Sequence, residues 1–226
     1  QCQILYELEG SSAARVMLVG LGSKKGFNPR QFRSALIPAF SQLEKSGAAD
    51  CLVMLPNDAD DDDSYRLTRE AVDAAETAVY RFDQCKSDPK SPKRPLRRVA
   101  LLVQSRSQLA AAKRAAVHGE SIAKGARLAK DLANLPGNIC TPSYLAEQAQ
   151  AVGRGNRKLK VTVLGEKQME KLGMGSLLSV SRGSRQEARL IVMEYKGGKA
   201  GSKPIALVGK GLTFDAGGIS IKPAAD

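Results

Sequence analysis

The sequence is poor in the side chains that bind transition metals through nitrogen and sulfur. It contains one histidine, His118, and four cysteines, none of which forms a Cys-x-x-Cys pair. Structural zinc sites gather several such ligands at short spacings, so the pattern argues against a zinc finger or zinc ribbon. We expect the cysteines to be free thiols in a reducing cytoplasm. They are Cys2, Cys51, Cys85 and Cys140.

Long apolar runs are also missing. No segment approaches the roughly 20 apolar residues that a membrane-spanning helix requires. Gln1 is not followed by the basic and then apolar leader of a secretory signal. Hydrophobic residues make up 42% and charged residues 26% of the chain, as in ordinary globular proteins. We therefore expect a cytoplasmic protein with no membrane partner.

A nucleotide-binding loop is a further absence. Gly20 and Gly22 form a Gly-x-Gly pair, but no third glycine follows in the register of a dinucleotide-binding loop. We find no other phosphate-binding loop in the sequence. A nucleotide-binding domain is therefore a weak interpretation of this chain.

Strand and helix patterns alternate along the chain, and this alternation predicts an α/β fold with parallel strands. The predicted strands cover residues 15–20, 51–55, 98–103, 159–164, 189–195 and 204–208. The predicted helices cover residues 28–47, 64–83, 108–135, 142–152 and 166–172. The aspartate-rich residues 58–63 are predicted to form a solvated loop.

A long alanine-rich helix divides the chain into two parts. It is followed by Pro136, Gly137 and Asn138, which end it firmly. We expect an N-terminal α/β domain over residues 1–106, a connecting helix over 107–135 and a second α/β domain over 136–226. His118 lies inside the helix, where a packing or hydrogen-bonding role is expected.

The most informative segment reads VGKGLTFDAGGISIKP and covers residues 208–223. An apolar run at 205–208 predicts a buried strand that leads into it. Four glycines follow within ten residues, which indicates backbone shapes that a Cβ would hinder. Lys210, Asp215 and Lys222 stand on this loop just past a strand, where open α/β sheets place their active sites.

A second block, DLANLPGNICTPSYLA, covers residues 131–146. Together the two blocks resemble the leucyl (cytosol) aminopeptidase family, and most closely its bacterial aminopeptidase A branch. The second block resembles the junction between that family's linker helix and its catalytic domain. Weaker similarity at residues 80–84 and 94–97 extends the resemblance over nearly the whole chain.

The resemblance implies an α/β metallopeptidase catalytic domain in an enzyme that releases N-terminal, leucine-type residues from peptides. It implies two divalent ions, Mn²⁺ or Zn²⁺, and a homo-hexamer. Lys210 and Asp215 match two metal ligands of the family, and Lys222 matches a catalytic lysine that stays cationic. A desolvated lysine beside a dication loses its proton more easily, so its neutral amine can bind the metal.

The resemblance further implies that this chain is part of a longer polypeptide. The family's other acidic ligands, its catalytic arginine and its Asn-Thr-Asp-Ala-Glu-Gly-Arg signature would follow Asp226. Its N-terminal domain would begin before Gln1. We expect the 226-residue piece alone to bind divalent ions weakly and to hydrolyse nothing measurably.

The charge of the chain supports an alternative function. With 35 basic and 23 acidic residues the net charge is +12, and residues 86–98 are rich in lysine and arginine. Some bacterial proteins that this chain resembles also bind DNA in recombination and transcriptional control. Aromatic residues are only 4% and no base-reading motif is present, so contacts would be to phosphates. The candidates are Lys93, Arg94, Arg97 and Arg98, for which solvation or pairing with nearby acids is the competing interpretation.

Overall fold

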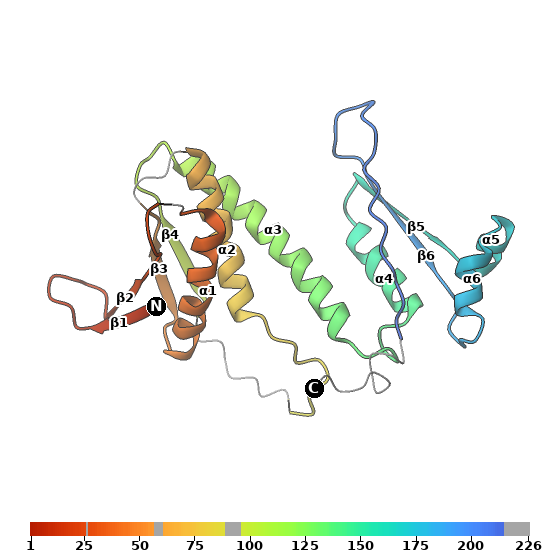
Figure 1. The fold of residues 1–226 in the computed structure, drawn as a ribbon, viewed down its shortest axis with the longest axis horizontal. Coiled ribbons are helices and arrows are strands. Elements are labelled where there is room, and N and C mark those ends of the chain that lie inside the picture. Colours follow the sequence, from red (N-terminus) through yellow and green to blue (C-terminus); the bar gives the residue numbers. More distant parts are fainter. Residues whose placement is uncertain (26, 57–60, 89–95, 215–226) are drawn as a thin grey trace. The chain divides into compact units, whose positions relative to one another are not determined.

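The computed structural model describes residues 1–25, 27–56, 61–88 and 96–214, apart from the side chains of residues 61 and 62. The chain divides into two compact units, Gln1–Asp131 and Leu132–Asp226 (Figure 1). Among the helices that the structure describes, none is both long enough and apolar enough to cross a bilayer.

The described residues of the first unit form two small sheets and three helices. The strands are β1 (Cys2–Tyr6), β2 (Arg15–Val19), β3 (Asp50–Met54) and β4 (Arg98–Leu102), and the helices are α1 (Pro29–Lys45), α2 (Asp61–Val79) and α3 (Leu109–Asn134). β1 pairs antiparallel with β2, whereas β3 pairs parallel with β4. The expected α/β fold is confirmed, and the expected parallel pairing holds for β3 and β4.

The core of this unit forms where α1 and α2 cover one face of the β3–β4 sheet. Phe32 and Phe40 from α1 and Ala71 from α2 are at most 2% exposed. Because side chains alternate along a strand, every second residue of β3 and β4 faces these helices. The inward-facing residues are Cys51, Val53, Val99 and Leu101.

Helix α1 begins at a strong local signal. The side chain of Asn28 accepts a hydrogen bond from the backbone N–H of Gln31 at 3.0 Å, and Pro29 occupies the first turn. Both features satisfy or avoid backbone N–H groups that have no partner inside a helix. Pro38 lies within α1, which runs on without interruption to Lys45.

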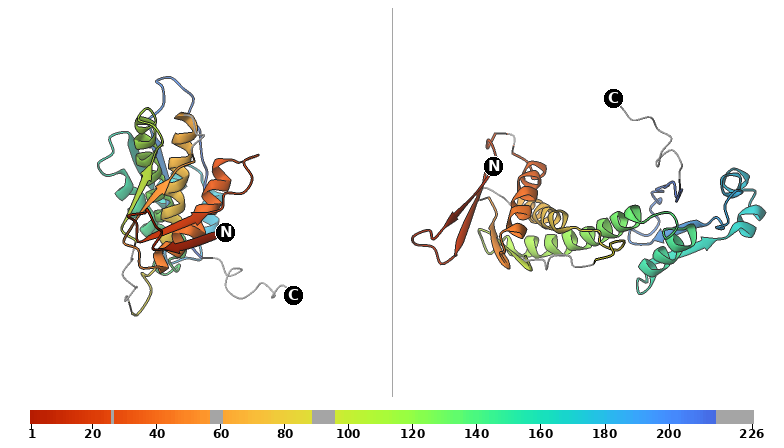
Figure 2. Two further views of the ribbon diagram at one scale, coloured as in Figure 1. Left: turned by 90° about the vertical axis from the view of Figure 1, so that its left-hand side faces the viewer. Right: turned by 90° about the horizontal axis from the view of Figure 1, so that it is seen from below.

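Helix α3 lies against α2 (Figure 2). The two helices come so close that a Cβ placed on Gly119 would lie 2.9 Å from Cβ of Val72. His118 and Tyr65 share a hydrogen bond of 2.8 Å between Nδ1 and the hydroxyl. The hydrogen-bonding role that we expected for His118 is thus confirmed.

The second unit is a two-stranded ribbon with short helices. Its described elements after α3 are α4 (Pro142–Gly153), β5 (Leu159–Leu164), α5 (Glu166–Lys171), α6 (Gly175–Ser181) and β6 (Leu190–Tyr195). β5 and β6 pair antiparallel, with Leu159 opposite Tyr195. The carboxylate of Glu166 accepts a hydrogen bond from the backbone N–H of Ala188 at 2.8 Å, which ties the segment before β6 to α5.

The structure corrects five sequence-based expectations. β1 and α6 have no counterpart among the predicted elements. The sequence predicts a loop at residues 58–63 and a helix at 64–83, whereas α2 begins at Asp61 and ends at Val79. Residues 61–63 are therefore helical. Asp63 lies in the first turn of α2, where the helix dipole favours a negative charge. Residues 204–208 form no strand. The antiparallel pairs β1–β2 and β5–β6 also differ from an all-parallel arrangement, because antiparallel strands need no crossover helix.

Candidate functional site

A compact turn joins α3 to α4 in the second sequence block. The backbone N–H groups of Ile139 and Cys140 both donate to the carbonyl of Pro136, at 2.9 Å each. Thr141 then caps α4, since its hydroxyl accepts a hydrogen bond from the backbone N–H of Tyr144 at 3.2 Å. The turn is therefore held by hydrogen bonds at both ends.

The glycine-rich segment approaches this turn directly. A Cβ placed on Gly137 would lie 2.7 Å from the carbonyl oxygen of Thr213 and 3.5 Å from Cβ of Phe214. Only a residue without a side chain permits so close a backbone approach. The two sequence blocks, which are more than sixty residues apart in the chain, thus meet at Gly137 and Thr213.

Upstream of that contact the segment is highly exposed. Ile205, Leu207 and Val208 are 90%, 94% and 98% exposed. A strand is stable only when its backbone groups pair with a neighbour, and no segment in the described part of the chain pairs with residues 204–208. The buried strand expected at 205–208 is therefore absent here, and its apolar side chains lie in solvent.

The structure describes only one of the two expected metal ligands and does not describe the expected catalytic lysine. Lys210 is exposed on the segment that leads to Thr213. Asp215 and Lys222 lie outside the described residues. Within residues 1–25, 27–56, 61–88 and 96–214, no three histidine, cysteine or acidic side chains come together as a metal-binding group. Those residues alone therefore do not supply the ligand set of a two-metal centre.

Ion pairs and a backbone hydrogen bond hold both described ends of the basic segment at residues 86–98. Lys86 forms an ion pair of 2.7 Å with Asp83, and Arg98 forms one of 2.9 Å with Asp50. The backbone N–H of Arg97 donates to the carbonyl of Ala49 at 2.7 Å. Lys93 and Arg94 lie outside the described residues.

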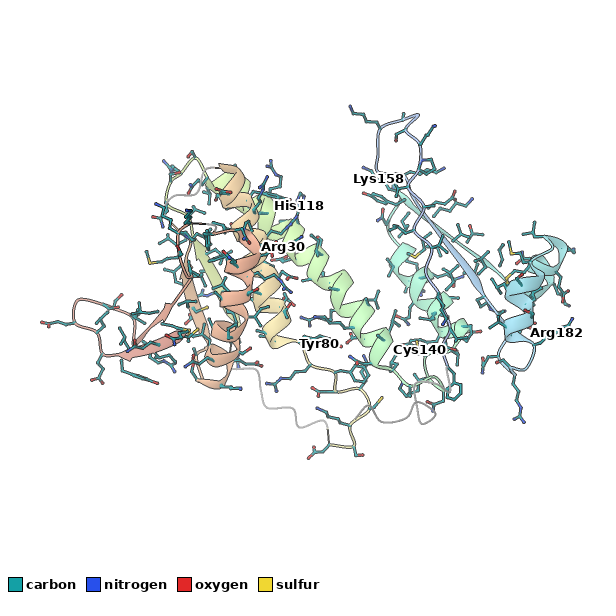
Figure 3. All side chains as sticks on the ribbon, in the orientation of Figure 1. Arg30, Tyr80, His118, Cys140, Lys158 and Arg182 are labelled. Atoms are coloured by element: carbon teal, nitrogen blue, oxygen red, sulfur yellow. The ribbon has the colours of Figure 1, made fainter. Side chains whose placement is uncertain are left out.

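Two cysteine thiols have a raised pKa. Burial raises the pKa of the Cys140 thiol, which lies in the turn before α4 and is labelled in Figure 3. Burial and then the negative charge of Asp50 raise the pKa of the Cys51 thiol in β3. Both effects disfavour the thiolate, so neither cysteine has the environment of a nucleophile or of a metal ligand.

Gly137 is the structural residue that sequence analysis missed. Its sequence block predicts the end of a helix and carries the family resemblance, but neither signal predicts a contact for the glycine. A glycine directly after Pro136 in a helix-ending turn is the local signal. Such a signal indicates a turn, yet it cannot reveal which distant backbone lies against the glycine.

Comparison with family models gives two matches. The model described as the cytosol aminopeptidase family, N-terminal domain, matches residues 1–89. The model described as the catalytic domain of the same family matches residues 127–226. The second match includes both the turn around Gly137 and the glycine-rich segment.

Curated relatives agree with these models. A probable cytosol aminopeptidase of Nitrosococcus oceani is 46% identical over 99% of this chain, which covers 45% of that protein. A probable cytosol aminopeptidase of Alkalilimnicola ehrlichii is 45% identical over 100% of this chain and 46% of its own length. The chain thus spans less than half the length of these relatives.

A solved structure has the same fold. A tomato leucine aminopeptidase variant superposes with a TM-score of 0.83 at 25% identity, over 96% of this chain and 42% of the tomato chain. The match extends over nearly the whole chain, so the fold of this protein recurs in that enzyme.

Proposed function

The chain belongs to the cytosol aminopeptidase family, and from this premise we propose that the full protein is a metal-dependent aminopeptidase. It releases N-terminal residues, with a leucine-type preference, from peptides in the cytoplasm, and it assembles as a homo-hexamer. The observation that carries the proposal is the contact between Gly137 and Thr213, which joins the two family motifs of the sequence.

Three residues of the glycine-rich segment carry the chemistry in this proposal. Lys210, as the neutral amine, and Asp215, as a carboxylate, would hold divalent ions. Lys222 stays cationic and donates hydrogen bonds to the substrate carbonyl as negative charge develops on its oxygen. When bound, a pair of Mn²⁺ or Zn²⁺ ions would supply an activated water and polarise the scissile carbonyl.

The exposure of Lys210 bears on its proposed role. An ammonium group in water keeps its proton, so a lysine can become a ligand only where the site excludes water and places positive charge beside it. Lys210 is exposed in the structure. Its ligand role therefore depends on parts of the full protein that surround the glycine-rich segment.

The proposal is tested by assaying the full-length protein on a leucine chromogenic amide, with and without a metal chelator and with Mn²⁺ added back. We expect activity that disappears with the chelator and returns with the metal. A full-length protein that is folded and metal-loaded but hydrolyses no N-terminal amide would contradict the proposal.

The DNA-binding alternative at residues 86–98 stays a prediction. The ion pairs of Lys86 and Arg98 favour a structural role for the described ends of this segment. Both pairs are exposed enough for salt to weaken them, so they do not prevent phosphate contacts. DNA retardation at several salt concentrations, with Lys93, Arg94, Arg97 and Arg98 replaced by Gln, tests it directly.

A further inference from the structure

Positively charged side chains from two separate stretches of the second unit lie at one end of the β5–β6 ribbon. One stretch leads into β5 and the other follows β6. A hydrogen bond joins them, because the backbone N–H of Lys196 donates to the carbonyl of Lys158 at 2.8 Å. Figure 3 labels Lys158 at this end. The exposed cations here are Arg154, Arg157, Lys158, Lys160, Lys196, Lys199 and Lys203, and together they are called the ribbon-end cluster below.

The cluster has almost no compensating charge. Within residues 154–160 and 194–203 the only acidic side chain is Glu194, which lies opposite Lys160 in the ladder. None of the seven cations forms an ion pair with another residue in the described parts of the chain. Seven positive charges against one negative charge give this end a net charge of +6.

Two of these lysines face each other. Leu159 pairs with Tyr195, so the next position along the antiparallel ladder places Lys158 opposite Lys196. Like charges directly opposite each other destabilise a strand pair. An anion bound between the two ammonium groups would remove that repulsion, so this position favours a ligand with negative charge.

An exposed aromatic ring lies at the same end. Tyr195 is 66% exposed. Its ring lies over Gly197, because a Cβ on that glycine would be only 2.6 Å from the tyrosine hydroxyl oxygen. The absent side chain of Gly197 thus lets the ring rest against the backbone while most of its surface stays open. An open ring supported in this way is a suitable platform for stacking.

We propose that the ribbon-end cluster binds single-stranded nucleic acid, with phosphates on Lys158 and Lys196 and an unpaired base stacked on Tyr195. Proteins that bind single strands without sequence preference combine a basic surface with exposed aromatic rings in this way. Neighbouring residues of a strand face opposite sides, so Tyr195 lies on the other face from Lys196. A flexible single strand can wrap around the ribbon end and reach both faces, whereas a stiff duplex with stacked bases cannot.

This surface is separate from the proposed peptidase residues. It includes neither Lys210 nor the positions of Asp215 and Lys222, and it lies in a different part of the sequence from residues 86–98. Its function therefore stands or fails independently of the proposed aminopeptidase activity.

The test is fluorescence anisotropy with a short labelled oligothymidine and the 226-residue chain over a range of salt concentrations. Tyr195→Ala should weaken binding about tenfold, the effect of losing one stacked base, while Tyr195→Phe should keep the affinity. Replacing Lys158 and Lys196 together by Gln should lower the log–log salt slope by about 1.4, since each phosphate contact contributes about 0.7.

The matched control replaces Lys167 and Lys171 by Gln, which removes the same charge from exposed positions on α5. This pair should leave the slope unchanged. Thermal melting followed by circular dichroism checks that each variant is folded. The proposal is overturned if the control pair lowers the slope equally, if folded Tyr195→Ala binds like wild type, or if replacing Lys158 and Lys196 weakens the binding of duplex DNA as strongly as that of oligothymidine.

Discussion

The carbonyl oxygen of Thr213 lies so close to Gly137 that a Cβ on that glycine would be 2.7 Å away. At this contact, the described part of the glycine-rich segment packs against the turn between α3 and α4. It depends on a residue with no side chain, because a Cβ essentially never lies so close to a backbone oxygen.

Gly137→Ala should lower stability by about 1–3 kcal/mol, because the new methyl group forces the backbone of Thr213 away. Thermal melting of the second unit measures the effect. Gly175→Ala is the matched control, since a Cβ at that position would have nothing within 4 Å of it and the residue begins α6. It should be neutral or slightly stabilising, because alanine favours helices more than glycine does. Equal loss in both variants would contradict the role of the Thr213 contact.

Substitution of the three proposed site residues in the full-length protein should strongly reduce activity. Lys210→Ala and Asp215→Ala should each reduce turnover by orders of magnitude and lower the bound metal, because each removes a ligand. Lys222→Ala should reduce turnover while the metal content stays normal, because its expected role is to stabilise developing negative charge. Metal analysis alongside kcat separates the two roles, and equal metal loss in all three variants would refute the distinct role of Lys222. Lys171→Ala is the control for loss of an exposed lysine.

Arg81→Ala should destabilise the first unit by about 1–3 kcal/mol. The guanidinium of Arg81 is 2.9 Å from the carboxylate of Glu44, whose side chain is only 7% exposed, so truncation leaves a buried carboxylate without its partner. Arg98→Ala is the matched comparison, because the side chains of Arg98 and Asp50 are 77% and 62% exposed. Its effect should be at most about 1 kcal/mol. Urea unfolding of both variants measures the difference, and a larger loss for Arg98→Ala would contradict this view of the two ion pairs.

Thiol alkylation should distinguish the buried Cys140 and the partly buried Cys51 from the exposed Cys85. Burial raises the pKa of Cys140, and burial with the charge of Asp50 raises the pKa of Cys51. Only the thiolate is alkylated, and a raised pKa lowers the thiolate fraction at a given pH. Mass spectrometry across a pH series should show Cys85, which is exposed, reacting first, with Cys51 and Cys140 following only at higher pH. Simultaneous modification of all three under native conditions would contradict the assignment.

Much of the helical structure could be predicted because its signals are local. Asn28 followed by Pro29, and Thr141 followed by Pro142, are cap-and-proline pairs, and α1 and α4 begin at these pairs in the structure. The family motifs are likewise properties of contiguous sequence. The strand at β1 was missed because the short segment carries no strong alternation and its identity depends on β2, its partner.

The sequence by itself determined where most helices lie, that the fold is α/β, and that the chain carries the motifs of one peptidase family. Only the tertiary structure decided which strands pair and in which direction, that residues 204–208 lie exposed without a described partner, and that Gly137 meets Thr213. The reason is physical: a helix satisfies its hydrogen bonds within a few neighbouring residues, whereas a strand or a backbone contact needs a partner that can lie anywhere along the chain.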